Sequence, residues 1–282
     1  MKKSLCGAIA FICIFMLSLS AISASVYASD TLTEILIPES FLGNFEEKEE
    51  IEALAEEVLD MANCFEVDGF HAEVSDVDFS NAYCVFVEAN ILEAMPKTTE
   101  ELDKLLDSAH RVWNIPVHAN GKTVLVQVSR GLELSEMDLD DHTEEEIERL
   151  KEKAGKWQTV SSAMYEDGEI PEQKIGEILS ENHKNTDKCK CVLIGGEPGI
   201  RTLLALVIEN DAVSGAISLE RAVSDELQQN QMYSLDEFAK AVFQDSSAIG
   251  YYIAGGAGII GIAGVIIADI FIRKRFVKKH EG

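Results

Sequence analysis

The chain has 282 residues and carries 50 acidic against 24 basic side chains, a formal net charge of −26. The section from Asp30 to Asp245 is more acidic still, with 48 Asp and Glu against 17 Lys and Arg. A charge of this sign excludes a nucleic-acid-binding protein, which needs a basic surface, and argues against adhesion of this section to an anionic membrane. The hydrophobic content of 46% and the presence of only 5 prolines indicate a folded chain.

Residues 1–28 have the layout of a secretory signal peptide. Two lysines precede an apolar stretch from Leu5 to Ile22, and the small residues Val26 and Ala28 occupy the −3 and −1 positions of a cleavage site. We expect cleavage after Ala28. The alternative is an uncleaved anchor, since about 18 apolar residues are enough to cross a bilayer. Both arrangements place the acidic section outside the cytoplasm.

The acidic section begins with helical and strand patterns in alternation. Asn44 and Glu47 have the spacing of a helix-capping box, and apolar residues follow at helical intervals from Phe45 to Phe65. A strand is predicted at Tyr83–Val87.

A second helix is predicted to begin at Thr98, with Glu101 completing its cap. Its inward positions continue beyond residue 110, so that it includes His110 and Arg111; they are Leu102, Leu105, Leu106, Ala109, Val112 and Trp113. The dipeptide Asn120-Gly121 then lies between two β-rich runs and predicts a hairpin over residues 115–128.

The later part of the acidic section repeats this alternation. The predicted elements are a helix capped by Thr143 and Glu146 that stops at Gly155, a strand at 157–165, a short helix opened by Pro171, a hairpin at 191–208 with its turn at 195–199, and a helix capped by Ser234 and Glu237 that runs to Phe243. The fold class is therefore α+β, with antiparallel hairpins and amphipathic helices. The order strand, helix, hairpin occurs twice, which suggests a duplicated unit.

The segment Ala248–Ile272 is 25 residues long and contains one charge, Asp269. At 1.5 Å per residue it spans roughly 37 Å, enough to cross a hydrocarbon core of about 30 Å. The basic residues expected on the cytoplasmic side follow at once within the tail 273–282. We therefore predict a single-pass cell-membrane protein whose acidic domain, residues 30–245, is extracytoplasmic and whose C-terminus is cytoplasmic.

Small residues recur at four-residue intervals along this predicted span. This spacing lets two helix backbones approach closely and favours lateral association in lipid, with a second copy or a membrane partner. The candidate association residues are Gly250, Ala254, Gly258 and Gly261.

Four cysteines lie in the acidic section and are disulfide candidates in an oxidising compartment: Cys64, Cys84, Cys189 and Cys191. Cys189 and Cys191 are too close in sequence to bond each other without strain, so a disulfide would join one of them to Cys64 or Cys84. The alternative is buried free thiols, since Cys84 and Cys191 lie in apolar strands.

No standard catalytic or ligand-binding motif occurs, and the sequence predicts no catalytic residue, cofactor or metal site. The glycine loop at 195–199 continues into a strand and contains Glu197, so we interpret it as a hairpin turn and not as a phosphate loop. The acidic run from Glu133 to Glu148 has His142 and Thr143 where a calcium loop needs an acid and a glycine. The predicted function is an extracytoplasmic binding or interaction module of unknown ligand; the alternatives are a membrane-tethered envelope hydrolase and a cation-dependent adhesin.

Overall fold

The structure is a computed structural model that describes residues 32–131, 143–182, 184–197, 200, 202–224 and 226–244. The predicted signal peptide (1–28), membrane span (248–272) and basic tail (273–282) lie outside these residues, as do the small residues of the span. Within the described ranges, no helix combines the length and the apolar character that crossing a bilayer requires.

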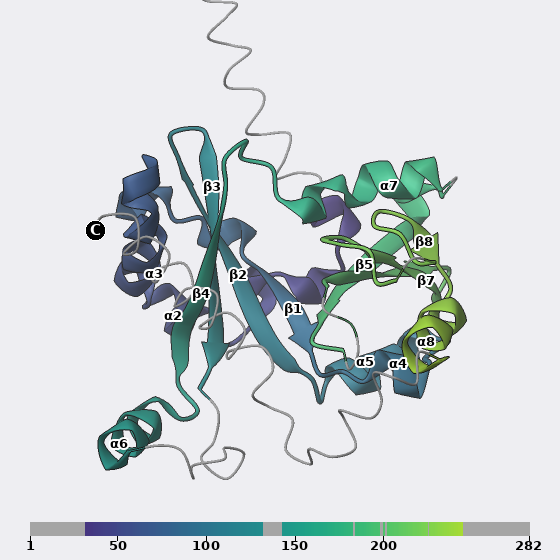
Figure 1. Ribbon diagram of the computed structural model, residues 1–282, viewed down its shortest axis with the longest axis horizontal. Helices are drawn as coiled ribbons and strands as arrows, with labels where there is room; N and C mark the ends of the chain where they lie inside the picture. The colour runs from purple at the N-terminus through teal and green to yellow at the C-terminus, as the bar shows by residue number, and fades with distance from the viewer. Residues whose placement is uncertain are drawn as a thin grey trace, which may run out of the picture.

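The described residues form an α+β fold around one mixed sheet of eight strands, in the order β4-β3-β2-β1-β5-β6-β7-β8 (Figure 1). The strands are β1 (Tyr83–Val87), β2 (His110–Ala119), β3 (Lys122–Arg130), β4 (Trp157–Tyr165), β5 (Cys189–Gly195), β6 (Leu204–Glu209), β7 (Ala212–Ser218) and β8 (Met232–Tyr233). Neighbouring strands run antiparallel, except that β1 and β5 are parallel.

The helices connect and cover these strands. The α-helices are α2 (Lys48–Glu52), α3 (Ala55–Ala62), α4 (Ile91–Ala94), α5 (Thr99–Leu106), α6 (Glu144–Lys153), α7 (Ile175–Glu181) and α8 (Leu235–Gln244). The 3-10 helices are η1 (Pro38–Ser40), η2 (Leu42–Asn44), η3 (Asn63–Asp68), η4 (Val74–Asp76), η5 (Phe79–Asn81), η7 (Pro171–Lys174) and η8 (Thr186–Lys188).

The two antiparallel halves of the sheet, β1 to β4 and β5 to β8, meet at the parallel pair of β1 and β5. In the first predicted strand–helix–hairpin unit, β1 pairs directly with the hairpin strand β2. In the second unit, three strands separate β4 from β5. The two units therefore resemble each other in order along the chain and differ in their place in the sheet.

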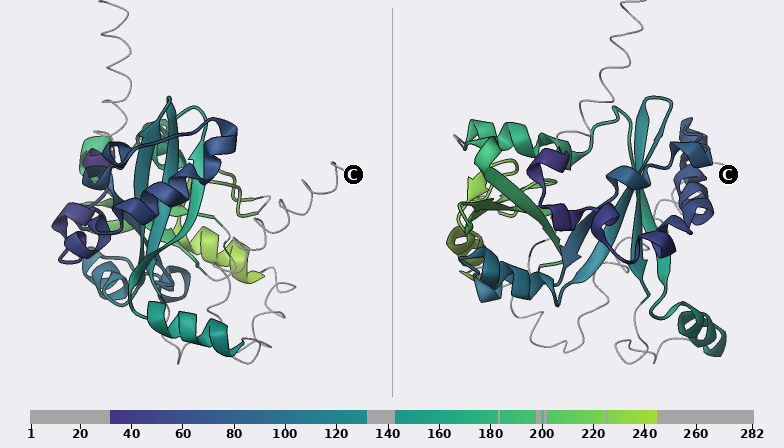
Figure 2. Two further views of the ribbon diagram at one scale, coloured as in Figure 1. Left: turned by 90° about the vertical axis from the view of Figure 1, so that its left-hand side faces the viewer. Right: turned by 180° about the vertical axis from the view of Figure 1, so that it is seen from behind.

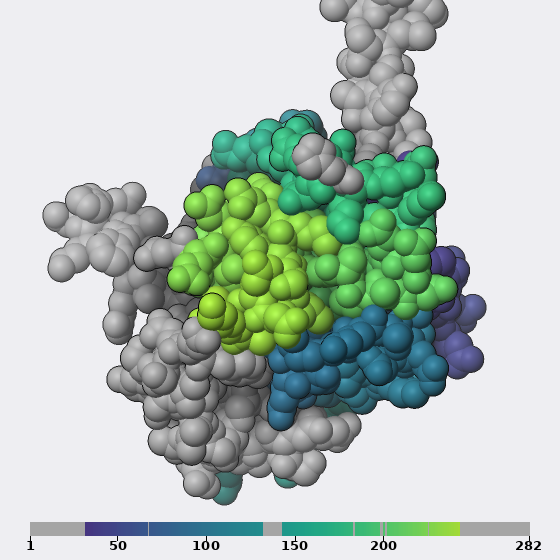
Figure 3. All heavy atoms as spheres, turned by 90° about the vertical axis from the view of Figure 1, so that its right-hand side faces the viewer, coloured from purple at the N-terminus to yellow at the C-terminus, as the bar shows by residue number. Residues whose placement is uncertain are grey.

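A separate hydrophobic core covers each face of the sheet, because side chains of a strand alternate between its two faces. One core joins Trp113 of β2 to residues of α2, α3, α5 and α8, including Ile51, Val58 and Phe238. Figure 2 shows α3 lying across the β3–β4 end of the sheet, and Figure 3 shows α8 beside α4 and α5. The second core joins Tyr83 of β1 to α7.

Several sequence-based predictions are confirmed. The strands at 83–87 and 157–165 form as expected. The β2–β3 hairpin turns at Asn120 and Gly121, whose φ angles of 55° and 74° are those that an Asn-Gly turn provides. Thr143 and Ser234 cap α6 and α8, since each hydroxyl accepts the backbone N–H three residues later.

The predicted cap of the first helix is wrong. The side-chain amide of Asn44 donates to the Pro38 carbonyl at 2.6 Å, and Asn44 ends η2. The helix begins at Lys48 without a side-chain cap, and the expected single helix is divided into α2, α3 and η3. Ile51 and Val58 nevertheless face the core, as their spacing predicted.

The predicted second helix is too long. It ends at Leu106, and Val112 and Trp113 lie in β2, as do His110 and Arg111. The apolar spacing beyond Leu106 fits both a helix and a strand, and cross-strand pairing of β2 with β1 and β3 decides between them. In β2, the Arg111 guanidinium stacks on the ring of Phe45 at 4.8 Å.

Candidate functional site

A row of polar side chains crosses the first half of the sheet on the face that α7 covers. Tyr83 on β1 is opposite Asn114, Asn114 is opposite Gln127, and Gln127 is opposite Ser161 on β4. The Ser161 hydroxyl donates to Gln127 Oε1 at 2.5 Å, and Gln127 Nε2 donates to Asn114 Oδ1 at 3.2 Å. Asn114 and Ser161 are only 3% and 6% exposed. Because buried polar groups need hydrogen-bond partners, these two hydrogen bonds join the polar side chains of β2, β3 and β4.

Glu172 extends the row beyond the sheet. The Tyr83 hydroxyl donates to Glu172 Oε1 at 2.9 Å, while the second oxygen, Oε2, is buried and has no hydrogen-bond partner among the residues that the structure describes. Pro171 opens η7 at its first position and so fixes the turn that carries Glu172 inward. Burial raises the pKa of the Glu172 carboxyl to about 7. The pKa of Tyr83 is raised well above its usual value, first by burial and then by the nearby Glu172.

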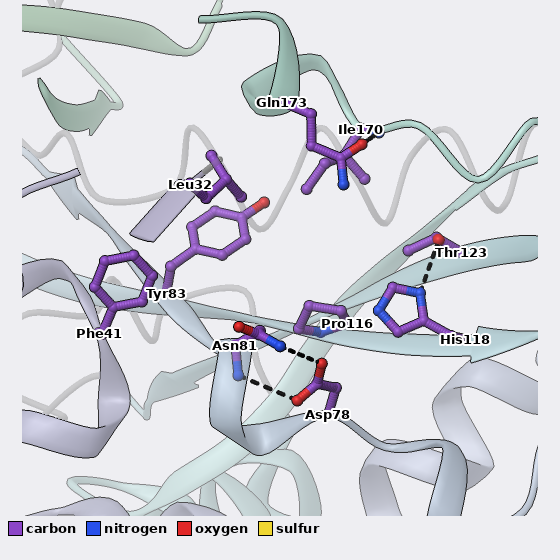
Figure 4. Close-up of a pocket in the computed structure, with 10 residues that line it drawn as sticks. All are labelled: Leu32, Phe41, Asp78, Asn81, Tyr83, Pro116, His118, Thr123, Ile170 and Gln173. Carbon is purple, nitrogen blue, oxygen red and sulfur yellow. Dashed lines mark hydrogen bonds between the residues drawn. The ribbon is translucent and has the colours of Figure 1, made fainter. Parts of the chain in front are cut away.

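A small cavity of about 50 Å³ adjoins Tyr83, and Figure 4 shows the tyrosine ring beside Leu32, with Phe41 nearby. The ten residues around the cavity come from the N-terminal segment, η5, β1, the β2–β3 hairpin and η7. They are Leu32, Phe41, Asp78, Asn81, Tyr83, Pro116, His118, Thr123, Ile170 and Gln173. None of these is a lysine or an arginine, so the cavity offers a carboxylate and neutral polar groups beside an apolar wall.

His118 and Thr123 lie side by side on the cavity, with His118 Nδ1 3.0 Å from Thr123 Oγ1. The Thr123 hydroxyl donates its proton to the Gly168 carbonyl at 3.0 Å. With its proton on Gly168, the Thr123 hydroxyl is free to accept a hydrogen bond from the His118 tautomer that carries its proton on Nδ1. These contacts hold the turn at Gly168 against the β2–β3 hairpin.

Asp78 supplies the carboxylate of the cavity. It accepts hydrogen bonds from the Ser80 hydroxyl at 2.6 Å and from the Asn81 side-chain amide at 2.6 Å. Burial raises the pKa of Asp78, but the hydrogen bonds from Asn81 and Ser80 outweigh burial, and the pKa is lowered overall. Asp78 therefore remains a charged acceptor at neutral pH.

The sequence predicts that Glu197 lies in a hairpin turn. In the structure its side chain also contacts the start of α4, which the sequence did not indicate. Its carboxylate is 3% exposed and accepts the backbone N–H groups of Ile91 at 3.1 Å and Leu92 at 3.3 Å. These two N–H groups belong to the first turn of α4, where backbone N–H groups have no carbonyl partner within the helix. Glu197 thus ties the β5–β6 loop to the segment that follows β1.

The four disulfide candidates are free thiols in the structure. Cys64 is exposed on η3, whereas Cys84 is buried in the core on the α3 side of the sheet. Cys189 and Cys191 are buried in the core on the α7 side. Burial raises the pKa of both Cys84 and Cys191 to about 12. A bond between Cys84 and either cysteine of β5 would have to pass through the sheet, which makes their packing as small apolar side chains the better account.

The other histidines that the structure describes form only isolated pairs with acids. His71 lies 4.0 Å from Glu66, and His110 lies 3.9 Å from Glu88, and both histidines are exposed. In the part of the chain that the structure describes, no group of three or more His, Cys, Asp or Glu side chains is arranged to hold a metal ion. Most of the acidic run, together with His142 and His183, lies outside the described residues.

No protein-family model matches this chain, and neither a curated protein nor a solved structure matches it. The cavity and the polar row are therefore interpreted from their own chemistry. The cavity presents the charged acceptor Asp78 beside the aromatic rings of Phe41 and Tyr83. The polar row adds the buried carboxyl of Glu172, whose pKa is raised to about 7.

Proposed function

We propose that the protein is a single-pass, membrane-anchored binding module whose acidic domain lies outside the cytoplasm. The observation that carries this proposal is the apolar segment Ala248–Ile272, with its single charge and the basic residues that follow at once. Helix α8 ends at Gln244, so only residues 245–247 separate the folded domain from that segment. The domain would therefore stand directly on the membrane surface.

The cavity beside Tyr83 supports binding over catalysis. A hydrolase using this cavity would need His118 to accept the proton of Thr123, and that proton is directed to Gly168. The cavity instead presents the Asp78 carboxylate and the Phe41 and Tyr83 rings. These groups favour a small cationic or hydrogen-bond-donating group, since a carboxylate pairs with it and aromatic faces attract it.

The anchoring and its sidedness can be tested with Cys64. Its thiol is exposed, whereas Cys84, Cys189 and Cys191 are buried. We expect a membrane-impermeant maleimide to label the full chain on intact cells, and the Cys64→Ser variant to lose that label. The protein should remain with the membrane fraction after alkaline extraction.

The matched control is a cysteine in the predicted cytoplasmic tail, Lys278→Cys in the Cys64→Ser background. This variant should react only after the cells are permeabilised. Labelling of Lys278→Cys on intact cells, protection of Cys64 from the reagent, or recovery of the full chain in the soluble fraction would each refute the proposed topology.

A further inference from the structure

Strand β4 forms an edge of the sheet, and neither a charge nor a proline protects that edge. It pairs with β3 alone, and no described residue pairs with its outer side. Its nine residues, Trp157–Tyr165, contain no charge and no proline, although 26% of the chain is charged. Edge strands are normally protected by charge, proline or a β-bulge, because their free N–H and C=O groups can pair with another chain; of these, β4 has only the bulge. Val160, in the middle of β4, is 39% exposed and is the extra residue of a β-bulge, since Ser161 pairs with Gln127 and Thr159 pairs with Val128.

The residues that flank β4 are charged, and the two flanks have opposite signs. Lys153 and Lys156 precede the strand, whereas Glu166 and Asp167 follow it, and all four are exposed. When a strand pairs antiparallel with its own copy, the start of each strand lies beside the end of the other. The lysines of each copy would then meet the acids of its partner. Parallel pairing would bring like charges together.

We propose that β4 is a homodimerisation edge at which two copies of this chain pair antiparallel about a two-fold axis and join their sheets. The occupant is a second copy because the charge pattern of β4 and its flanks is complementary to itself. The domain has 48 acidic against 17 basic residues, so two copies repel each other over most of their surfaces. Because β4 itself carries no charge, two copies can approach there with less repulsion. This inference concerns the domain itself and does not depend on the proposed membrane anchor.

The first test is cysteine cross-linking of the full chain in native membranes, in a Cys64→Ser background. Val160→Cys should give a covalent dimer on mild oxidation, because the central residues of two antiparallel copies lie close together. Val74→Cys is the matched control, since Val74 is a more exposed valine, at 53%, and lies on η4, which packs against β2 and α3. Equal cross-linking at both positions, or none at Val160→Cys, would overturn the inference.

The second test is charge reversal, read as the dimer fraction of the full chain in mild detergent. Lys156→Glu or Glu166→Lys alone places like charges together at two symmetry-related positions and should weaken dimerisation on the order of tenfold. The double variant should restore it. These two residues lie ten positions apart along one extended strand, about 33 Å, so rescue cannot arise within one copy. A double variant no better than the single ones, or a dimer indifferent to all three, would refute the pairing.

A third variant separates this edge from association through the predicted span. Replacing Ala254, Gly258 and Gly261 by Leu should leave the Val160→Cys cross-link in place. The variant could instead lose the cross-link while both charge-reversal variants dimerise like the wild type. That result would show that the copies associate through the span, and it would refute dimerisation at the β4 edge. Failure of the Cys64 topology test would leave the charge-reversal result unaffected, so the two proposals fail separately.

Discussion

The Tyr83 hydroxyl donates a 2.9 Å hydrogen bond to the Glu172 carboxylate, joining residues that are 89 positions apart. The contact fastens η7 onto β1 at the point where the two halves of the sheet meet. Glu172 is 3% exposed, and no described residue hydrogen-bonds to its second oxygen. Since burial raises the pKa of this carboxyl to about 7, the contact connects the stability of the fold to pH.

The first prediction is that stability falls as the pH rises from about 4.5 to about 7. Above its ordinary pKa of 4.5, Glu172 ionises in the unfolded chain, while the folded chain keeps it protonated up to about 7. The folded state then binds more protons, so the free energy of unfolding declines with pH, by roughly 3 kcal/mol over the interval. Glu172→Gln should flatten this slope. Urea denaturation of the full chain in mild detergent, followed by tryptophan fluorescence, measures it.

Glu169→Gln provides the control for this experiment, because Glu169 is an exposed carboxylate three residues away. It should keep the wild-type slope. If Glu172→Gln keeps the same slope as Glu169→Gln, the carboxyl of Glu172 is not the group that couples folding to pH.

The second prediction concerns Glu197, which accepts the first N–H groups of α4. Glu197→Ala leaves two buried donors without a partner and should cost about 2–3 kcal/mol of unfolding free energy. Glu197→Gln retains one acceptor oxygen and should cost less. Glu93→Ala, at an exposed position on α4 itself, should change stability by less than about 0.5 kcal/mol. Equal urea midpoints for Glu197→Ala and Glu93→Ala would contradict this role.

Local signals in the sequence predicted a large part of the fold. Asn120-Gly121 specified the β2–β3 turn, and the Thr143 and Ser234 caps specified the starts of α6 and α8, because each depends on residues within a few positions. Where local signals conflicted, as at Val112 and Trp113, pairing with distant strands decided the structure. Strand β7 was not predicted, although Asn210 and Asp211 supply a positive-φ turn before it.

Most of the candidate site could not be predicted from the sequence, because its contacts join residues that are far apart along the chain. Nothing in the sequence distinguishes Glu172 from the other acids among the 50. Its hydrogen bond with Tyr83, 89 positions away, is visible only in the structure. The polar row depends on strand register, which places Asn114 opposite both Tyr83 and Gln127. The edge position of β4 likewise follows from the strand order and not from any property of residues 157–165.

The third prediction is that the acidic domain contains four free thiols of unequal reactivity. In the folded full chain, Cys64 should react with a maleimide within minutes, because it is exposed. Cys84 and Cys191 should resist, since burial hides them and raises their pKa to about 12, which removes the reactive thiolate at neutral pH. Mass spectrometry of peptides from labelled protein distinguishes the sites.

Unfolding in urea without a reductant provides the decisive comparison for these cysteines. All four, Cys64, Cys84, Cys189 and Cys191, should then become labelled, because the sheet separates Cys84 from the two cysteines of β5. A disulfide would leave a pair unlabelled until a reductant is added. A pair that joins Cys84 to Cys189 or Cys191 would require β1 or β5 to turn over, and would contradict the strand register that also aligns Tyr83 with Asn114.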